Sequence, residues 1–114
     1  MGVEEYVERI FRSVEKELRD IAEGKLPVEE YVADVLGIRR TQTFIPSEGW
    51  VTDGYILTLT AGGPSTYLNT EEKQIEVYWT PRKWVQKITD QKALEGLEII
   101  KEYLDEVFGG MSHD

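Results

Sequence analysis

The sequence predicts an α+β domain of two layers, in which a meander of three to five antiparallel strands carries amphipathic helices on one face. Apolar residues recur at helical spacing near both ends of the chain, and residues 55–80 contain three short β-type runs separated by turn-like connectors. Helices with one apolar stripe and a sheet with one apolar face can bury each other. We therefore expect the N-terminal and C-terminal helices on the same side of the sheet, in the order α-α-β-(β)-β-β-β-α.

The first predicted helix covers residues 2–23. Its apolar positions recur every three or four residues along one face, and most other positions are charged. Gly24 suits the left-handed backbone that ends many helices. The apolar stripe is either a face buried in the chain's own core or the seam of a coiled-coil dimer. It consists of Val3, Val7, Ile10, Val14, Leu18 and Ile21.

A second, shorter helix is predicted from Pro27 to Leu36, because Pro favours the first helical turn and Gly37 can end the helix. This segment contains no Arg or Lys, so the helix pair has nothing with which to read DNA as a helix-turn-helix motif. The composition then changes to Ile, Thr, Gln and Phe without a helical period. Residues 38–45 are therefore predicted to form a strand.

Asp53-Gly54 is a strong hairpin signal between β-type residues. Residues 50–52 are either strand residues that pair into the run at 55–61 or part of a wider loop. After Thr80, Pro81 interrupts the ladder, and residues 82–88 follow neither the strand nor the helix period. The sequence leaves open whether these two segments are strands or loops.

The register of the three central runs follows from two four-residue loops, 62–65 and 71–74. These loops pair Ala61 with Thr66 and Thr70 with Ile75. The apolar side chains then share one face, which we expect to meet the helices. That face is expected to carry Leu57, Leu59, Leu68, Ile75 and Val77.

The same register places polar and aromatic side chains on the opposite face of the sheet. Its predicted rows are Thr60, Tyr67 and Tyr78, followed by Thr58, Asn69 and Glu76. Such a face either meets solvent or recognises a protein or a small ligand, since tyrosine is favoured at interfaces. These six residues are the predicted partner or ligand surface.

Thr89 or Asp90 is predicted to cap the last helix, and Gly109-Gly110 to end it. We expect residues 1–110 to form a single domain and residues 111–114 to be a disordered tail. The apolar stripe of this helix consists of Leu94, Leu97, Ile100, Leu104 and Val107.

Composition limits the function. The chain has no cysteine, and its single histidine, His113, lies in the predicted tail, so we expect no metal site, no cofactor and no Ser-His or Cys-His nucleophile. No apolar run is long enough to cross a membrane, and the acidic N-terminus is unlike a signal peptide, so a cytoplasmic location is expected. The many charged residues and the lack of cysteine are typical of thermophilic proteins.

The net charge of −9 is concentrated on the predicted helices, whereas residues 37–92 hold six acids and seven bases. An acidic protein repels phosphate backbones, so nucleic acid is an unlikely partner. Gly62 and Gly63 form the one loop that could bind an anion through its backbone. It lacks the spacing and lysine of a phosphate-binding loop and precedes a strand. A plain hairpin loop is the better interpretation.

The leading hypothesis is a small, acidic, non-catalytic binding protein that uses the Thr/Tyr/Asn sheet face or an edge strand, as a homodimer or with a protein partner. The first alternative is a carboxylate-dependent enzyme or a small-ligand binder in a helix–sheet cleft. Its candidate carboxylates are Glu48, Asp53, Glu76 and Asp90. The second alternative is an inhibitor whose acidic helices imitate nucleic acid.

Overall fold

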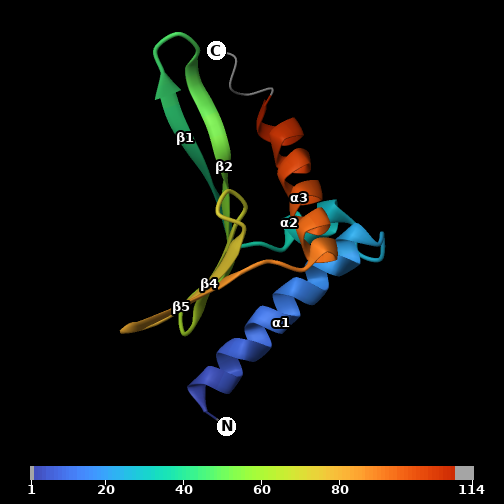
Figure 1. Cartoon of the computed structure of the whole chain (residues 1–114), viewed down its shortest axis with the longest axis vertical. Helices are drawn as coiled ribbons and strands as arrows, with labels where there is room; N and C mark the ends of the chain where they lie inside the picture. The colour runs from blue at the N-terminus through green and yellow to red at the C-terminus, as the bar shows by residue number, and fades with distance from the viewer. Residues whose placement is uncertain (1, 110–114) are drawn as a thin grey trace.

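The computed structural model describes residues 2–109 and confirms the α+β class and the predicted order of elements (Figure 1). The tail predicted at 111–114, with His113, lies outside the described residues. In chain order the elements are α1 (Val3–Ala22), α2 (Val28–Ala33), β1 (Gly37–Ile45), β2 (Gly49–Thr60), β3 (Ser65–Asn69), β4 (Gln74–Trp79), β5 (Arg82–Lys87) and α3 (Gln91–Gly109).

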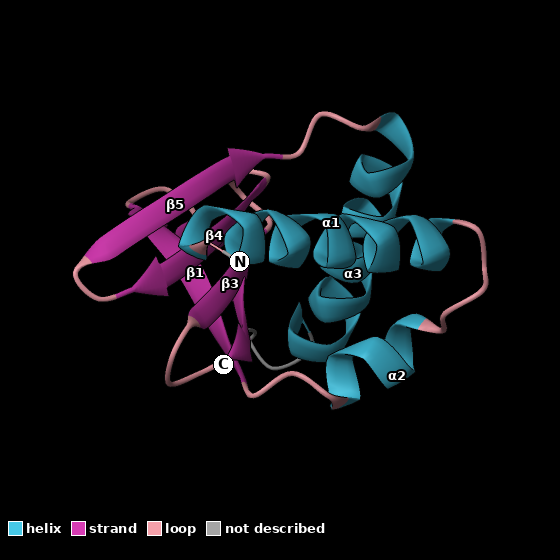
Figure 2. Ribbon diagram, turned by 90° about the horizontal axis from the view of Figure 1, so that it is seen from below, coloured by secondary structure: helices cyan, strands magenta, loops and turns pink. Residues whose placement is uncertain are grey.

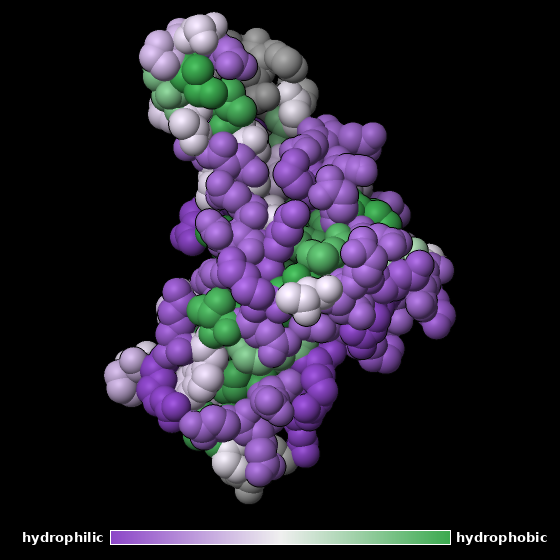
Figure 3. Space-filling model, viewed as in Figure 1, coloured by the Kyte–Doolittle hydropathy of each residue, from purple (hydrophilic) through white to green (hydrophobic). Residues whose placement is uncertain are grey.

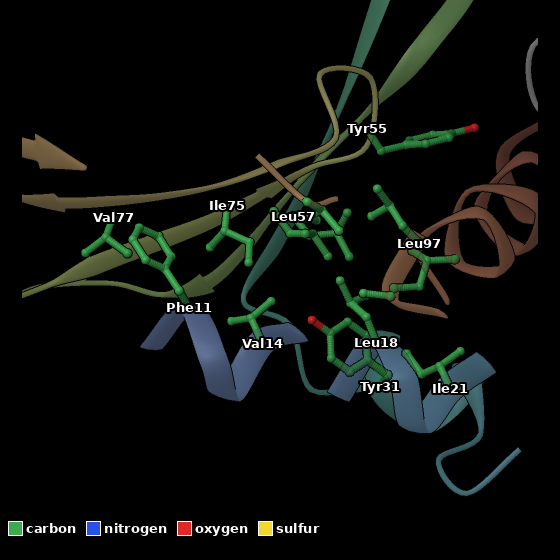
Figure 4. Close-up of a cluster of buried hydrophobic side chains, with 14 of the residues drawn as sticks. Phe11, Val14, Leu18, Ile21, Tyr31, Tyr55, Leu57, Ile75, Val77 and Leu97 are labelled. Atoms are coloured by element: carbon green, nitrogen blue, oxygen red, sulfur yellow. The ribbon is translucent and has the colours of Figure 1, made fainter. Parts of the chain in front are cut away.

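The five strands form one antiparallel sheet in the order β1-β2-β3-β4-β5, and the three helices lie on one side of it (Figure 2). Side chains from α1 and α3 meet the inner face of the sheet in a single apolar cluster (Figure 4). Burying this cluster is the main stabilising contribution to the fold. Its fully enclosed members include Leu18, Leu57, Leu68, Ile75, Val77, Ile100 and Leu104.

The helices α1 and α3 cross at very close range. A Cβ atom on Gly96 of α3 would lie 1.9 Å from the carbonyl oxygen of Leu18 in α1, so only glycine fits at this crossing. Asp90 caps the start of α3, as predicted, because its Oδ2 accepts the backbone N–H of Ala93 at 2.9 Å. Gly24 follows α1 with a φ of 77°, which also agrees with its predicted role.

Both segments that the sequence left open are strands. Residues 50–52 belong to the long strand β2, and residues 82–87 form β5 at the edge of the sheet. The Asp53-Gly54 pair does not form a turn, and that prediction is wrong. The β1–β2 hairpin turns at residues 46–48 instead, with Ile45 opposite Gly49. A turn with Pro46 at its second position, closed by the Glu48 N–H to the Ile45 carbonyl oxygen at 2.8 Å, forms in preference to one at Asp53-Gly54.

The two loops of the central meander are each four residues long, as predicted, but each begins one residue earlier, at Ala61 and at Thr70. When a loop of fixed length shifts by one residue along the chain, each strand residue pairs with a partner two positions from the predicted one. Because side chains alternate with a period of two, each still points to the predicted face of the sheet. Leu68 therefore pairs with Leu57 and Ile75 rather than with the predicted Leu59 and Val77. Thr70 lies in the second loop, where its Oγ1 accepts the backbone N–H of Tyr55 at 2.9 Å.

Two β-bulges interrupt β2 and change which way its side chains point. Thr41 pairs with Gly54 and the next residue pairs with Thr52, so Asp53 is an extra residue. At the other end, Thr58 pairs with Tyr67 whereas Thr60 pairs with Thr66, so Leu59 is extra. As a result Thr60 leaves the polar face on which the sequence placed it.

The β1–β2 hairpin contacts α3 through few side chains. Tyr55 donates its hydroxyl proton to Asp105 Oδ1 at 2.7 Å, and its ring packs against Phe108 with centroids 6.1 Å apart. Arg40 Nη1 donates to the carbonyl oxygen of Phe108 at 3.5 Å. Beyond these contacts the hairpin projects away from the rest of the molecule (Figure 1).

Candidate functional site

The outer face of the sheet, opposite the helices, carries a shallow groove of about 290 Å³ that crosses four strands. We call this surface the open face. It is built from alternate residues, because side chains on one strand point to the two faces in turn. The groove is lined by Arg39, Ile56, Ser65, Tyr67, Glu76 and Tyr78.

Tyr67 and Tyr78 form an aromatic pair in this groove. Their ring centroids lie 5.4 Å apart with the planes at 82°, an edge-to-face arrangement. The sequence placed them directly opposite each other, whereas Tyr67 pairs with Glu76, so the two tyrosines are diagonal neighbours. The ammonium of Lys83 lies 5.0 Å from the centre of the Tyr78 ring. Hydrogen bonding to the Tyr78 side chain raises the pKa of Lys83.

Glu76 is the carboxylate of this groove, and it is almost fully buried. Its Oε2 accepts hydrogen bonds from Gln74 Nε2 at 2.6 Å and from Asn69 Nδ2 at 3.5 Å. Its Oε1 accepts the hydroxyl proton of Tyr78 at 3.2 Å. Three neutral donors thus compensate the buried charge and fix the carboxylate in place. This arrangement orients Tyr78 across the groove.

The other predicted site residues divide between the two faces. Thr58 lies in the row of Tyr67 and Glu76 and stays half-buried on the open face. Asn69 is buried, and besides reaching Glu76 it accepts the backbone N–H of Glu72 at 2.9 Å. Thr60 is not on the open face, because its hydroxyl contacts the buried Thr66 at 3.0 Å on the helix side.

The open face also differs in charge from the rest of the molecule. Three basic side chains project from this face, which are Arg39, Lys83 and Lys87. The acidic side chain in the groove is Glu76. Lys87 is paired with Glu72 of the neighbouring loop at 3.6 Å. Arg39 is exposed, and no ion pair forms to it within residues 2–109. In a protein of net charge −9, the groove thus holds one arginine and one glutamate, and Lys83 lies beside it over the Tyr78 ring.

The loop of Gly62 and Gly63 lies on the helix side of the sheet. Gly62 has a φ of 106°, which only glycine adopts without strain. Gly63 helps to line a cleft of about 660 Å³ between α1 and the end of β2. Arg9 of α1 lines the same cleft. Binding of an anion by this loop remains a prediction.

The helix–sheet cleft contains none of the carboxylates proposed from the sequence. Glu48 lies in the β1–β2 turn, Asp53 bonds to Thr43 in the outer hairpin, and Asp90 caps α3. The carboxylate in the cleft is Glu17 of α1. The sequence did not predict it, because the local pattern does not show whether a glutamate beside the apolar stripe of a helix faces solvent or a cleft.

The tip of the β1–β2 hairpin carries a second exposed aromatic pair. Phe44 and Trp50 are 54% and 66% exposed, and their ring centroids lie 5.3 Å apart. Figure 3 shows apolar surface at this end of the molecule. Trp79 and Trp84 are half-buried by comparison, and Trp79 packs against Tyr6 of α1. Trp50 is thus the exposed tryptophan of the described chain.

Across residues 2–109, no cluster of three or more His, Asp or Glu side chains is placed to hold a metal ion. None of the helices in this range is long and apolar enough to span a membrane. The chain matches no family model, no curated protein and no solved structure. The function proposed below therefore rests on the geometry of this chain alone.

Proposed function

We propose that this protein is a non-catalytic binding protein that recognises an acidic protein partner through the open face of its sheet. The observation that carries the proposal is the Tyr67–Tyr78 pair beside the unpaired guanidinium of Arg39, on a sheet face that no described helix covers. Tyrosine and arginine are the side chains that most often anchor protein interfaces. A partner carboxylate would bind Arg39 while apolar groups cover the tyrosine rings.

The fixed Glu76 carboxylate supports binding rather than catalysis. An acid or base in a reaction must exchange its proton with a substrate, whereas Glu76 already accepts three hydrogen bonds from neighbouring side chains. Those bonds hold Tyr78 in a defined orientation before a partner arrives. Such preorganisation lowers the entropic cost of association.

The charge of the open face favours a different protein over a second copy of this chain. Two open faces in contact would bring the rows of Arg39 and Lys83 close to each other, and like charges at an interface are unfavourable. An acidic surface on another protein has no such cost. Oligomerisation through another surface remains a separate prediction.

A photo-crosslinking amino acid at position 67 tests the proposal, with the same group at the exposed position 102 of α3 as a control. The captured partner is then bound to purified variants. We expect Tyr67→Ala/Tyr78→Ala to weaken binding about 100-fold, as loss of a central aromatic anchor does. Arg39→Glu should also weaken binding, and the loss of affinity should be larger in low salt than in high salt.

Phe44→Ala/Trp50→Ala is the matched control, because it removes two exposed aromatic rings from a different surface. It should leave the affinity unchanged. Equal binding by the Tyr67/Tyr78 variant would show that the open face is not the interface. Sedimentation of the purified chain tests the remaining outcome: a dimer dissociated by the same two substitutions would identify the partner as a second copy.

A further inference from the structure

The two edges of the sheet, β1 and β5, differ in how they are protected against pairing with another strand. An edge strand presents unpaired backbone N–H and C=O groups, and proteins block such edges with proline and with charged side chains, lysine above all. β5 follows Pro81 and contains three basic residues, which are Arg82, Lys83 and Lys87. In β1 the two arginines lie near the start, and residues 41–45 contain neither a charge nor a proline. The outer half of β1 is therefore unprotected.

The pairing of β2 shows which backbone groups of β1 point outward. Tyr55 directs its N–H and C=O towards β3, where Thr70 Oγ1 accepts the first and the Thr70 N–H donates to the second, both at 2.9 Å. Arg40 lies opposite Tyr55 and so forms no backbone hydrogen bond with β2. The direction alternates along a strand, so the groups that point away from the sheet are those of Ile38, Arg40, Gln42 and Phe44. No hydrogen bond reaches these backbone groups from elsewhere in residues 2–109. We call these four residues the β1 edge.

The β1 edge ends beside the exposed aromatic pair at the tip of the hairpin. Alternate side chains of a strand share a face, so Phe44 lies on the same face as Arg40, and its ring packs against Trp50. The edge thus offers another strand both backbone hydrogen bonds and apolar surface, the two contributions to binding by strand addition.

Charge also varies along the hairpin. Residues 41–53 hold two acids and no base, whereas arginines occupy positions 39 and 40. If two copies of the hairpin paired antiparallel, the acidic half of each would approach the arginines of the other. A parallel arrangement would instead bring the arginines of the two copies together, which is unfavourable.

We propose that this protein forms a two-fold symmetric dimer in which the β1 edges of two copies pair antiparallel, centred on Gln42. A two-fold contact uses the same surface on both copies, so that surface must complement itself. In this register Gln42 lies opposite Gln42 of the second copy. Arg40 lies opposite Phe44 of the second copy, where a guanidinium stacks favourably on the ring.

Other registers fit less well. A centre at Arg40 would place two arginines opposite each other, and a centre at Thr41 would make them diagonal neighbours. Centres beyond Gln42 shorten the paired stretch, because β1 ends before Pro46. The register centred on Gln42 pairs residues 39–45 of each copy over a length of about 20 Å.

The dimer would join the two sheets into one continuous sheet. Its two-fold axis would run perpendicular to the sheet, so both open faces would stay accessible on the same side. This contact is therefore separate from the binding proposed for the open face. A contact along one strand edge is small, so we expect dimers at high micromolar concentration and monomers in dilute solution.

Two charge variants at the centre of the pairing test the contact and its register. Gln42→Lys and Gln42→Glu would each place like charges opposite each other, whereas an equal mixture of the two proteins pairs opposite charges. Sedimentation of the full chain from about 5 to 500 µM measures the dissociation constant. We expect dimerisation to weaken about fivefold in each variant alone and to recover in the mixture. A wild type that stays monomeric, variants that dimerise like the wild type, or a mixture without recovery would overturn the proposal.

Disulfide trapping tests the same geometry, because the chain has no native cysteine. Opposite residues of a hydrogen-bonded antiparallel pair have Cα atoms about 5.5 Å apart, which a disulfide can bridge. Gln42→Cys should therefore form covalent dimers under mild oxidation at least about tenfold faster than Val85→Cys, at an exposed position of the opposite edge strand. Equal rates would contradict pairing at the β1 edge.

The variant Tyr67→Ala/Tyr78→Ala separates this contact from the proposed function. Both substitutions change the open face and neither lies in β1, so dimerisation should be the same as in the wild type. A dimer that this variant abolished would lie on the open face, and the edge pairing would then be wrong.

Discussion

The pKa of the Glu17 carboxyl group is raised above its ordinary value. Partial desolvation by the surrounding protein is the main cause, and the negative charge of the neighbouring Asp20 is the second. The folded protein therefore binds this proton more tightly than the unfolded chain does. The consequence for stability has a definite sign, because ionising Glu17 is harder in the folded state.

We predict that Glu17 lowers stability as the pH rises from its ordinary pKa of 4.5 through the higher value of the folded state. Below that window the protonated form is present in both states, and Glu17→Gln should match the wild type. Above it, the variant should be the more stable protein. Urea unfolding of both proteins at several pH values between 3.5 and 8 measures the difference.

Asp20, whose pKa is lowered chiefly by its hydrogen bond with Lys16, contributes a slope of the opposite sign in both proteins. Comparing the two proteins at each pH largely removes that contribution. Glu29→Gln, which removes a carboxylate from an exposed position of α2, serves as the control for loss of one negative charge. A difference between Glu17→Gln and the wild type that did not change with pH would contradict the raised pKa of this carboxyl group.

At the scale of elements, the crossing of α1 and α3 fixes how the two helices sit on the sheet. Gly96 lets the backbones approach until the Leu18 carbonyl takes the place of a side chain. Glycine inside a helix costs about 1 kcal/mol relative to alanine. The close packing of Leu18, Leu97 and Ile100 offsets this cost.

We predict that Gly96→Ala destabilises the protein by about 2–3 kcal/mol, although alanine is the better helix former. The added methyl group must push the helices apart, and overpacking of this kind outweighs the gain in propensity. Glu98→Ala, at an exposed position of the same helix, should change stability by less than about 0.5 kcal/mol. Denaturant midpoints measure both, and a Gly96→Ala variant as stable as the wild type would refute the close crossing.

The elements themselves were largely predictable from the sequence, because apolar residues recur with a period of 2 in the strands and of 3.6 in the helices. Loops of the right length kept Leu68 on the core face even though its partners were wrong. The bulges of β2 could not be predicted. An extra residue leaves no mark in the local pattern, so Thr60 was assigned to the wrong face.

The residues of the candidate sites also divide into those that local sequence patterns predict and those that only the folded chain brings together. Tyr67, Glu76 and Tyr78 were predicted on the outer face, because alternation within a strand needs no tertiary information. Arg39 and Ile56 entered the groove through pairing of β1 with β2, which the sequence left unresolved. Glu17 and Tyr31 lie on different helices and line the same small cavity only in the folded chain, which no local pattern predicts.

At the scale of the whole molecule, the chain is elongated, with extents of 52, 35 and 24 Å. The apolar core lies under β2–β4 and the helices, whereas none of the residues from 41 to 53 is buried. The outer part of the β1–β2 hairpin is therefore held by its own backbone ladder. Its contacts with α3 end at Arg40 and Tyr55.

We predict that this outer hairpin opens locally without unfolding the core. Backbone amides in the ladder between Gln42 and Thr52 should exchange with deuterium at least about 100-fold faster than those between Ile38 and Leu57. Hydrogen exchange followed by mass spectrometry distinguishes the two ends of the same strands. Similar protection at both ends would mean that the hairpin and the core unfold as one unit.

The bulge at Asp53 also decides which flank of the hairpin displays its tryptophan. Because Asp53 has no partner in β1, Trp50 lies opposite Phe44, and the two rings pack together on the same side of the hairpin. If Asp53 instead paired with Gln42 as an ordinary residue of the ladder, Val51 rather than Trp50 would lie opposite Phe44. The irregular backbone at Asp53 thus keeps the two aromatic rings in contact at the end of the hairpin.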